Sequence, residues 1–262
     1  MSMYQYIIYE EEAGIATITM NRPKVYNALN DGMKEELLQA FQQAEKSEDV
    51  RVVVLAGAGK AFCSGQDLKA AQQELEGKAY SDAIRKFYNP LILQMRQMPK
   101  PIIAKVQGVA AGAGCSLALA CDVLVASEDS IFSELFVGIG LVMDSGSTFF
   151  LPRMIGSLKA FELATLGTQV QSAVALELGM VNRVVSEESL DRAVRTYAEG
   201  YLKAPTKTVG LIKQMFHQSA NMSLEDTLEL EAVFQDKAAA TADHLEGLKA
   251  FQEKRQPQFK GK

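Results

Sequence analysis

Two short apolar runs, each ending in a glycine-rich turn, constrain the fold of this chain more than any other feature. Residues 51–55 lead into the turn at 56–59, and residues 101–106 lead into the glycine-rich segment 108–114. Apolar runs of this length that end at glycines are typical of buried strands. A short apolar helix and a third run, residues 122–126, follow. Strands that alternate with helices favour an α/β domain with an extended sheet.

The flanking segments complete this outline. Residues 4–20 alternate between apolar and polar residues around an Ala-Gly turn, which predicts a β-hairpin. Asn30 or Asp31 is expected to cap the next helix, because apolar residues then recur at helical spacing. Residues 69–97 are expected to be helical, with a mobile first half. From Leu158 onward the pattern is mainly helical.

Length and composition limit the class of protein. The chain's length of 262 residues predicts either one large domain or one domain with an appendage. We divide it into an α/β core, residues 1–200, and a helical C-terminal region, residues 201–262, which is expected to serve assembly. Hydrophobic residues make up 48% and charged residues 23%, as in a soluble globular protein. The net charge of −5 argues against nucleic-acid binding, which needs a basic surface.

The sequence gives no sign of export, membrane insertion or metal binding. Its longest uncharged stretch, residues 106–121, is 16 residues long, which is too short to span a membrane. The N-terminus has no basic start followed by an apolar run, as a signal peptide would. The three cysteines form no C-x-x-C pair and there are only two histidines, so neither a disulfide framework nor a zinc site is expected. We therefore expect a cytoplasmic protein without bound metal.

Several common nucleotide-binding and catalytic motifs are incomplete or absent. G-x-G occurs three times, but the position of the third glycine holds Phe62, Leu117 and Met143, so the dinucleotide fingerprint is absent. No phosphate loop and no nucleophile elbow are present. Both histidines lie in the helical tail, which argues against a Ser-His-Asp site.

Two loops remain informative. Residues 62–68 and 108–114 both follow predicted strands and contain small residues whose backbone N–H groups can point outward, toward developing negative charge on an oxygen. The second loop also opens a helix, whose N-terminal amides add to the effect. Each loop alone is better explained as a plain tight turn than as an oxyanion site. Their occurrence together, about 50 residues apart, favours a shared site.

These loops belong to a longer series of matches by which the sequence resembles the crotonase, or enoyl-CoA hydratase/isomerase, superfamily over essentially its whole length. The matches, in order, are Asn21-Arg22-Pro23, Asn27-Ala28-Leu29, residues 61–68, 101–104 and 108–115, Cys121-Asp122, Gly140-Leu141, Asp144, Leu151-Pro152-Arg153 and the segment 246–259. The resemblance implies a repeated ββα superhelix with a helical C-terminal trimerisation region. It also implies a homotrimer or homohexamer.

The resemblance further implies an acyl-CoA thioester as substrate and no separate cofactor, since coenzyme A is part of the substrate. The thioester oxygen would lie between the backbone N–H groups of Gln66 and Ala113. Asp67 would mainly fix its own loop, and Asp122 would be structural. The implied substrate-binding positions are Ser64, Gly65, Asp67, Leu68, Gly112 and Phe136, and the implied apolar walls are Ala113, Cys115, Phe136 and Val142.

The acid and base residues depart from the hydratase pattern. The two glutamates of the family's hydratases correspond here to Ser116 and Phe136, which cannot titrate usefully. A carboxylate stands instead at Asp144, where dienoyl-CoA isomerases and the ring-epoxide isomerases of phenylacetate degradation carry an aspartate. Asp144 could equally cap a helix. We favour catalysis, because the preceding apolar run would raise the pKa of the carboxyl. Glu134 is interpreted as a surface or structural residue.

The sequence thus predicts an acyl-CoA isomerase, nearest to the ring-epoxide isomerase group. Asp144 would move a proton along the acyl chain while the two N–H groups stabilise a thioester enolate. A hydratase that adds water to 2-enoyl-CoA is the first alternative. A non-catalytic protein that binds acyl-CoA is the second. Residues 69–86 are expected to shape the acyl pocket.

Overall fold

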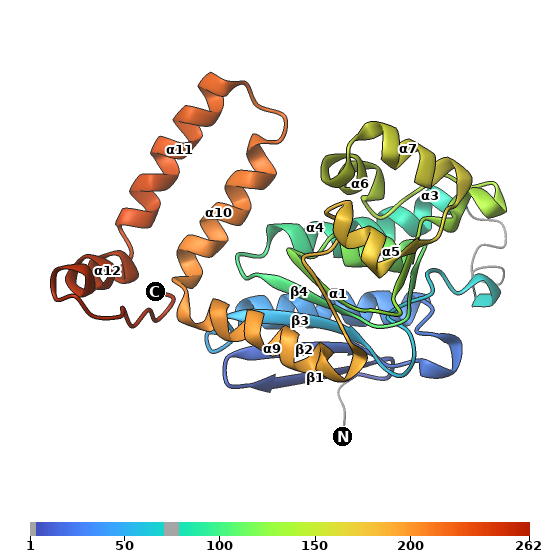
Figure 1. Cartoon of the computed structure of the whole chain (residues 1–262), viewed down its shortest axis with the longest axis horizontal. Coiled ribbons are helices and arrows are strands. Elements are labelled where there is room, and N and C mark those ends of the chain that lie inside the picture. The colour runs from blue at the N-terminus through green and yellow to red at the C-terminus, as the bar shows by residue number, and fades with distance from the viewer. Residues whose placement is uncertain (1–3, 71–78) are drawn as a thin grey trace.

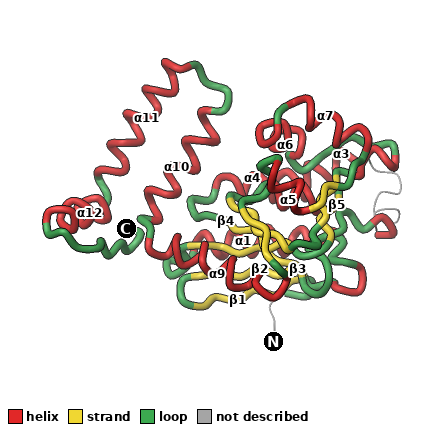
Figure 2. The backbone as a smooth tube through the Cα atoms, in the orientation of Figure 1, coloured by secondary structure: helices red, strands yellow, loops and turns green. Residues whose placement is uncertain are grey.

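The computed structural model describes residues 4–70 and 79–262. The centre of the molecule is a six-stranded sheet, and a second, three-stranded sheet lies beside it (Figures 1 and 2). The first sheet has the order β1 (Ile7–Glu12), β2 (Ile15–Met20), β3 (Val52–Gly57), β4 (Ile102–Val106), β6 (Val123–Ser127) and β9 (Arg183–Val185). The second has the order β5 (Val109–Ala111), β7 (Ile131–Ser133) and β8 (Val170–Gln171).

The predicted hairpin is confirmed, since β1 and β2 pair antiparallel in register from Ile7–Met20 to Glu12–Ile15. From β2 onward the first sheet is parallel. The prediction that residues 108–114 form only a loop is wrong. Three of these residues form β5, because they pair with β7, a strand that the sequence pattern did not reveal.

Helices cover both faces of the six-stranded sheet. On one face, α1 (Asp31–Lys46) and α4 (Asn89–Gln97) pack with the side chains of Val53 and Leu55. On the other face, α9 (Glu187–Lys203) packs with Val52 and Val54. Successive residues of a strand point to opposite faces, so a strand buried on both sides is apolar throughout. This is why β3 is a continuous apolar run.

The N-terminus of α1 and the helices around the second sheet complete the core of the molecule. Asn30 caps α1, because its side chain accepts a hydrogen bond from the N–H of Met33 at 2.9 Å. Of the predicted helix 69–97, residues 71–78 lie outside the described residues, as does part of the expected acyl-pocket segment. The helices around the second sheet are α3 (Tyr80–Ala83), α5 (Ala113–Leu119), α6 (Ser147–Ile155), α7 (Ser157–Leu166) and α8 (Ser172–Glu177). No helix within the described ranges is long and apolar enough to cross a membrane.

The C-terminal helices α10 (Thr206–Ser219), α11 (Leu224–Ala239) and α12 (Ala242–Gln252) extend away from the sheet (Figure 1). A buried ion pair anchors the first of them, since Lys213 Nζ lies 2.7 Å from Asp122 Oδ2. Asp122 also accepts from Arg96 and from the N–H of Ile102, at 3.0 and 2.9 Å. It therefore has the structural role expected of it. The division of the chain at residue 200 stays a prediction.

We predict that Asp122→Ala lowers the free energy of unfolding by about 3–5 kcal/mol, because it leaves the buried Lys213 ammonium without its counter-charge. Urea denaturation measures this value. Glu199→Ala is the matched control, since its partner Arg195 is 63% exposed and such surface pairs contribute about 0.2–1 kcal/mol. Equal losses for the two variants would contradict the anchoring role.

Candidate active site

The structure brings together the two loops that the sequence analysis singled out. Cys63 N–H donates to the carbonyl of Val109 at 3.0 Å, and Ala111 N–H donates to the carbonyl of Cys63 at 2.9 Å. These bonds form a parallel bridge between Cys63 and Ala110. The loop at 62–68 is therefore attached to β5 as if it were a further short strand.

The N–H groups of Gln66 and Ala113 are both available to a ligand. Gln66 faces Leu29 in a parallel bridge whose bonds use only the carbonyl of Gly65 and the N–H of Asp67. Ala113 is the first residue of α5, where N–H groups lack a partner within the helix. Across residues 4–70 and 79–262, neither N–H donates to a backbone carbonyl.

A glycine with positive φ precedes each of these donors. Gly65 has φ 93° and Gly112 has φ 51°, a region that side-chain-bearing residues rarely adopt. The two loops also approach closely at this point. A Cβ atom on Gly65 would lie 2.7 Å from the carbonyl oxygen of Ala111 and 3.4 Å from the nitrogen of Ala113. Only glycine at position 65 allows the two loops to come this near to each other.

Buried polar side chains hold the first loop from behind. Asn27 is fully buried and its Nδ2 donates to the carbonyls of Ala61 and Phe62 at 2.8 and 3.2 Å. Lys34 is 1% exposed, and its Nζ lies 3.2 Å from Gln66 Oε1 and 2.6 Å from Asp31 Oδ1. The hydroxyl of Tyr88 also donates to Gln66 Oε1. The side chain of Gln66 is thus occupied within the protein, which leaves its backbone N–H for the ligand.

Asp67 behaves as the sequence analysis expected. Its carboxyl accepts from the N–H of Ala70 at 3.2 Å and forms an ion pair with Arg22 at 2.9 Å. Burial acts to raise the pKa of Asp67, but the Ala70 N–H and the Arg22 guanidinium outweigh it and hold that pKa below its usual value. Asp67 therefore fixes the loop as a carboxylate and does not transfer protons.

The other proposed binding positions lie around the two donors. Ser64 is exposed and its Oγ donates to the carbonyl of Val25 at 3.3 Å. Leu68 is 57% exposed. Phe136 is buried, and its ring lies 4.0 Å from the place where Gly112 would carry a Cβ atom. Val142 was expected to form a wall of the site, but it is 86% exposed and forms none within this chain.

Asp144 is attached to the same helix that Ala113 begins. Its backbone carbonyl accepts from Ser116 Oγ of α5 at 3.2 Å and from the N–H of Ser147 at 3.1 Å. The alternative that Asp144 caps α6 is wrong, since the N-cap is Gly146 and no side chain caps this helix. The carboxyl is thus free of a capping role.

Burial raises the pKa of the Asp144 carboxyl above its usual value. The Ser145 hydroxyl, which donates to Asp144 Oδ1 at 2.8 Å, and the charge of Lys34 act against this shift. The expected direction is therefore present, and its cause is desolvation, as expected. Within the apolar run before Asp144, Val142 is 86% exposed, whereas Leu141 and Met143 are partly buried and pack against the core.

Glu134 was expected to be a surface or structural residue, and the surface alternative is wrong. The residue is 3% exposed, and its Oε1 accepts from Ser147 Oγ at 2.7 Å. Burial, together with the nearby charge of Asp144, raises the pKa of Glu134 to about 7. One signal for this burial was in the sequence: Glu134 alternates with Phe132 and Phe136, both of which are buried.

Comparisons with known proteins identify the family of this chain. The family model described as enoyl-CoA hydratase/isomerase matches residues 10–262. The chain belongs to the enoyl-CoA hydratase/isomerase family. It is 39% identical to the 1,2-epoxyphenylacetyl-CoA isomerase of Escherichia coli K12 over 99% of this chain and 100% of that protein. It is 33% identical to the trans-2-decenoyl-acyl-carrier-protein isomerase of Streptococcus mutans, over 99% of each chain.

Solved structures confirm the family's fold for this chain. The crystal structure of an enoyl-CoA hydratase from Mycobacterium smegmatis matches with a TM-score of 0.90 at 32% identity, over 97% of this chain and 99% of that one. The resemblance to the crotonase superfamily and the predicted α/β fold are therefore both confirmed. This enoyl-CoA hydratase/isomerase family member has relatives named for isomerisation and for hydration, so membership alone leaves the reaction open.

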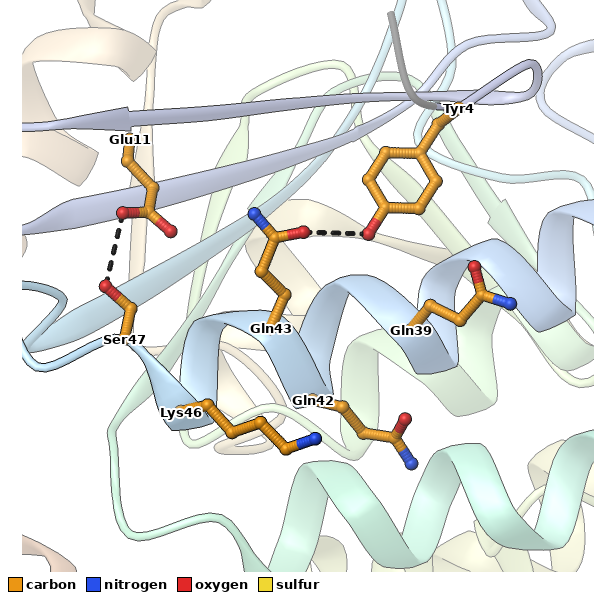
Figure 3. Close-up of a pocket in the computed structure, with 7 residues that line it drawn as sticks. All are labelled: Tyr4, Glu11, Gln39, Gln42, Gln43, Lys46 and Ser47. Atoms are coloured by element: carbon orange, nitrogen blue, oxygen red, sulfur yellow. Dashed lines mark hydrogen bonds between the residues drawn. The ribbon is translucent and has the colours of Figure 1, made fainter.

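A cavity elsewhere in this family member contains none of the predicted site residues. Its volume is about 610 Å³ and it lies between β1 and α1 (Figure 3). Its walls are mostly polar and are made by Tyr4, Glu11, Gln39, Gln42, Gln43, Lys46 and Ser47. Among the described residues, no group of three or more His, Cys, Asp or Glu could hold a metal ion.

We predict that Gly65→Ala lowers kcat for acyl-CoA turnover by about 10²–10³, the effect of losing one oxyanion donor. The added Cβ would meet the carbonyl of Ala111 at 2.7 Å and strain a positive φ, which displaces the N–H of Gln66. Steady-state kinetics measures the loss. Gly200→Ala is the matched control, because nothing lies within 4 Å of its Cβ position. Parent-like kcat in Gly65→Ala would contradict the assignment.

Proposed function

We propose that this protein is an acyl-CoA isomerase in which Asp144 is the proton-transferring base and the N–H groups of Gln66 and Ala113 bind the thioester oxygen. The observation that carries the proposal is the distribution of carboxyl groups. The positions of the hydratase glutamates hold Ser116 and Phe136, whereas a partly buried carboxyl, Asp144, is anchored to the helix that supplies one N–H donor. One base beside one oxyanion site suits proton relocation.

The reaction follows from these parts. Ionised Asp144 takes a proton from the carbon next to the thioester of a 3-enoyl-CoA, and the electron pair moves onto the thioester oxygen. The two backbone N–H groups stabilise the resulting enolate. Protonated Asp144 then returns the proton to the far carbon of the conjugated system, so that the double bond moves next to the thioester. No atom is gained or lost and no electron leaves the substrate. A ring epoxide next to a thioester is the second substrate type that we propose.

We predict that Asp144→Asn lowers kcat for isomerisation of a 3-enoyl-CoA by about 10²–10⁴, the usual contribution of a general base. KM should change little, because the N–H donors remain. Stopped assays with product separation measure both constants. Asp49→Asn, a change of the same kind at an exposed residue, should retain parent activity. An Asp144→Asn variant as fast as the parent would exclude Asp144 as the base.

The parent enzyme should also lose activity on the acid side at a pH above the ordinary aspartate pKa of 3.8. Asp144 must be ionised to accept a proton, and burial raises its pKa, so protonation on lowering the pH sets in earlier than for an exposed aspartate. A kcat profile against pH measures this limb. An acid limb at or below pH 3.8 would contradict the burial of the working carboxyl.

A hydratase is the second candidate, since a solved relative at 32% identity is named as one. It predicts loss of 2-enoyl-CoA with formation of a 3-hydroxyacyl product. Product analysis by mass spectrometry and NMR after supplying 2-enoyl-, 3-enoyl- and phenylacetyl-epoxide CoA esters separates the candidates. A binding protein without catalysis would bind these esters in calorimetry and convert none of them.

We also propose that the chain works in the cytoplasm as a homotrimer or homohexamer assembled through α10–α12. These helices expose large apolar side chains, which in an isolated chain would face water. They include Phe216, Leu224, Leu245 and Phe251 at 74, 70, 66 and 85% exposure. Light scattering during size exclusion should give three or six times 28.6 kDa. A particle of 28.6 kDa would exclude the proposal.

A further inference from the structure

A line of buried side chains connects Glu134 to both halves of the candidate site. Glu134 Oε1 lies 2.7 Å from Ser147 Oγ, which lies 2.7 Å from Ser116 Oγ. Ser116 Oγ in turn lies 3.2 Å from two backbone carbonyls, those of Asp144 and Gly112. The first carbonyl belongs to the proposed base, and the second belongs to the residue just before the donor Ala113. We call Glu134, Ser147 and Ser116 the polar chain.

Because the polar chain is buried, the hydrogen atoms for its contacts must come from its own side chains. Ser116 and Ser147 are fully buried and Glu134 is 3% exposed. Groups so enclosed must satisfy one another. Three contacts need a hydrogen each: the carboxyl with Ser147, Ser147 with Ser116, and Ser116 with a carbonyl. The two hydroxyls supply two hydrogens, so the third can come only from the carboxyl of Glu134.

The protonation state of Glu134 therefore decides what Ser116 does. When Glu134 is a carboxylic acid, it donates to Ser147, Ser147 donates to Ser116, and Ser116 donates to the carbonyls of Asp144 and Gly112. When Glu134 is ionised, Ser147 must donate to it instead and Ser116 must donate to Ser147. The carbonyls of Asp144 and Gly112 then lose the Ser116 hydroxyl. The Gly112 carbonyl keeps the N–H of Ser116 at 3.0 Å, whereas the Asp144 carbonyl keeps only the N–H of Ser147 at 3.1 Å and loses its bond to α5.

The surroundings of Glu134 favour its neutral, protonated form. Glu134 Oε2 has no hydrogen-bond partner among the described residues. Leaving a buried oxygen without a partner costs more free energy for a carboxylate than for a neutral acid. The titratable groups that face Glu134 are the Cys115 thiol of α5 and the Asp144 carboxyl. Neither supplies a positive charge, and Lys34 acts on Asp144. Burial and the Asp144 charge raise the pKa of Glu134 to about 7, against the hydrogen bonds of Ser147 and the Cys115 thiol, which lower it, so Glu134 is mainly the neutral acid below about pH 7.

We propose that Glu134 is a positioning residue of the isomerase. As a neutral acid it keeps the Asp144 base and the Ala113 N–H donor in their relative positions through Ser147 and Ser116. This proposal rests on the proposed function of Asp144. Glu134 acts through other residues, because its side chain is enclosed and hydrogen-bonded to Ser147.

The test compares Glu134→Gln with Ser116→Ala in the full-length protein. A glutamine amide donates to Ser147 as the acid does but cannot ionise, whereas Ser116→Ala removes the hydroxyl that donates to the two carbonyls. In the parent, kcat for 3-enoyl-CoA isomerisation should fall above about pH 7, as Glu134 ionises and Ser116 releases the two carbonyls. Glu134→Gln should keep kcat within about threefold of the parent at pH 6 and lose this alkaline fall. Ser116→Ala should lower kcat at least tenfold at pH 6 and also lack the alkaline fall, with KM unchanged.

Infrared difference spectra between pH 6 and pH 9 supply a readout that does not depend on turnover. The parent and Asp144→Asn should show the C=O band of a protonated carboxylic acid that disappears on raising the pH, and Glu134→Gln should lack it. Thermal melting checks that each variant is folded. If Ser116→Ala is unfolded, Ser116→Cys takes its place, since a thiol is a weaker hydrogen-bond donor at the same position.

The outcomes separate this proposal from the one it rests on. An inactive Asp144→Asn together with an unchanged alkaline limb in Glu134→Gln would overturn the positioning role and leave Asp144 as the base. A fall in kcat for Glu134→Gln as large as that for Ser116→Ala would also overturn it, because a neutral donor at position 134 would then not hold the site. A fully active Asp144→Asn would overturn the isomerase assignment, while the infrared band would still report the state of Glu134.

Discussion

The candidate site depends on one backbone interaction, the attachment of Cys63 to β5. Two hydrogen bonds, of 3.0 and 2.9 Å, join Cys63 to Val109 and Ala111. They join the two loops that carry the Gln66 and Ala113 N–H groups, which are 47 positions apart in sequence. Backbone donors held in a bonded framework need no rearrangement when charge develops on an oxygen, and this is the physical basis of oxyanion stabilisation.

Two carboxyl groups near this framework, those of Asp144 and Glu134, have different electrostatic surroundings. Asp144 keeps a hydroxyl partner, Ser145, and the attraction of Lys34, whereas Glu134 has hydroxyl contacts and no cation. Two like charges so near each other are costly, and the more enclosed group is the one that stays neutral. Environments that separate the pKa values of two acids are a general means of giving them different tasks.

The family explains the framework better than it explains the reaction. Relatives that share the fold carry names of isomerases and of a hydratase. A fold fixes where donors lie, whereas the side chains placed beside them determine the chemistry. The function that we propose for this chain rests on such side chains: Ser116 and Phe136, which do not titrate usefully, and the carboxyl of Asp144.

The sequence by itself determined the hairpin, the strands β3, β4 and β6, the Asn30 cap and the two loops, because local periodicity and glycine placement encode them. It also predicted different roles for two aspartates, proton transfer for Asp144 and fixing of its own loop for Asp67. Only the tertiary structure showed that residues 109–111 form a strand, because its partner β7 is remote in sequence. Likewise, the burial of Lys34 and Glu134 depends on which elements cover them. Local pattern states which residues share a face, but desolvation and hydrogen-bond partners are properties of the packed molecule.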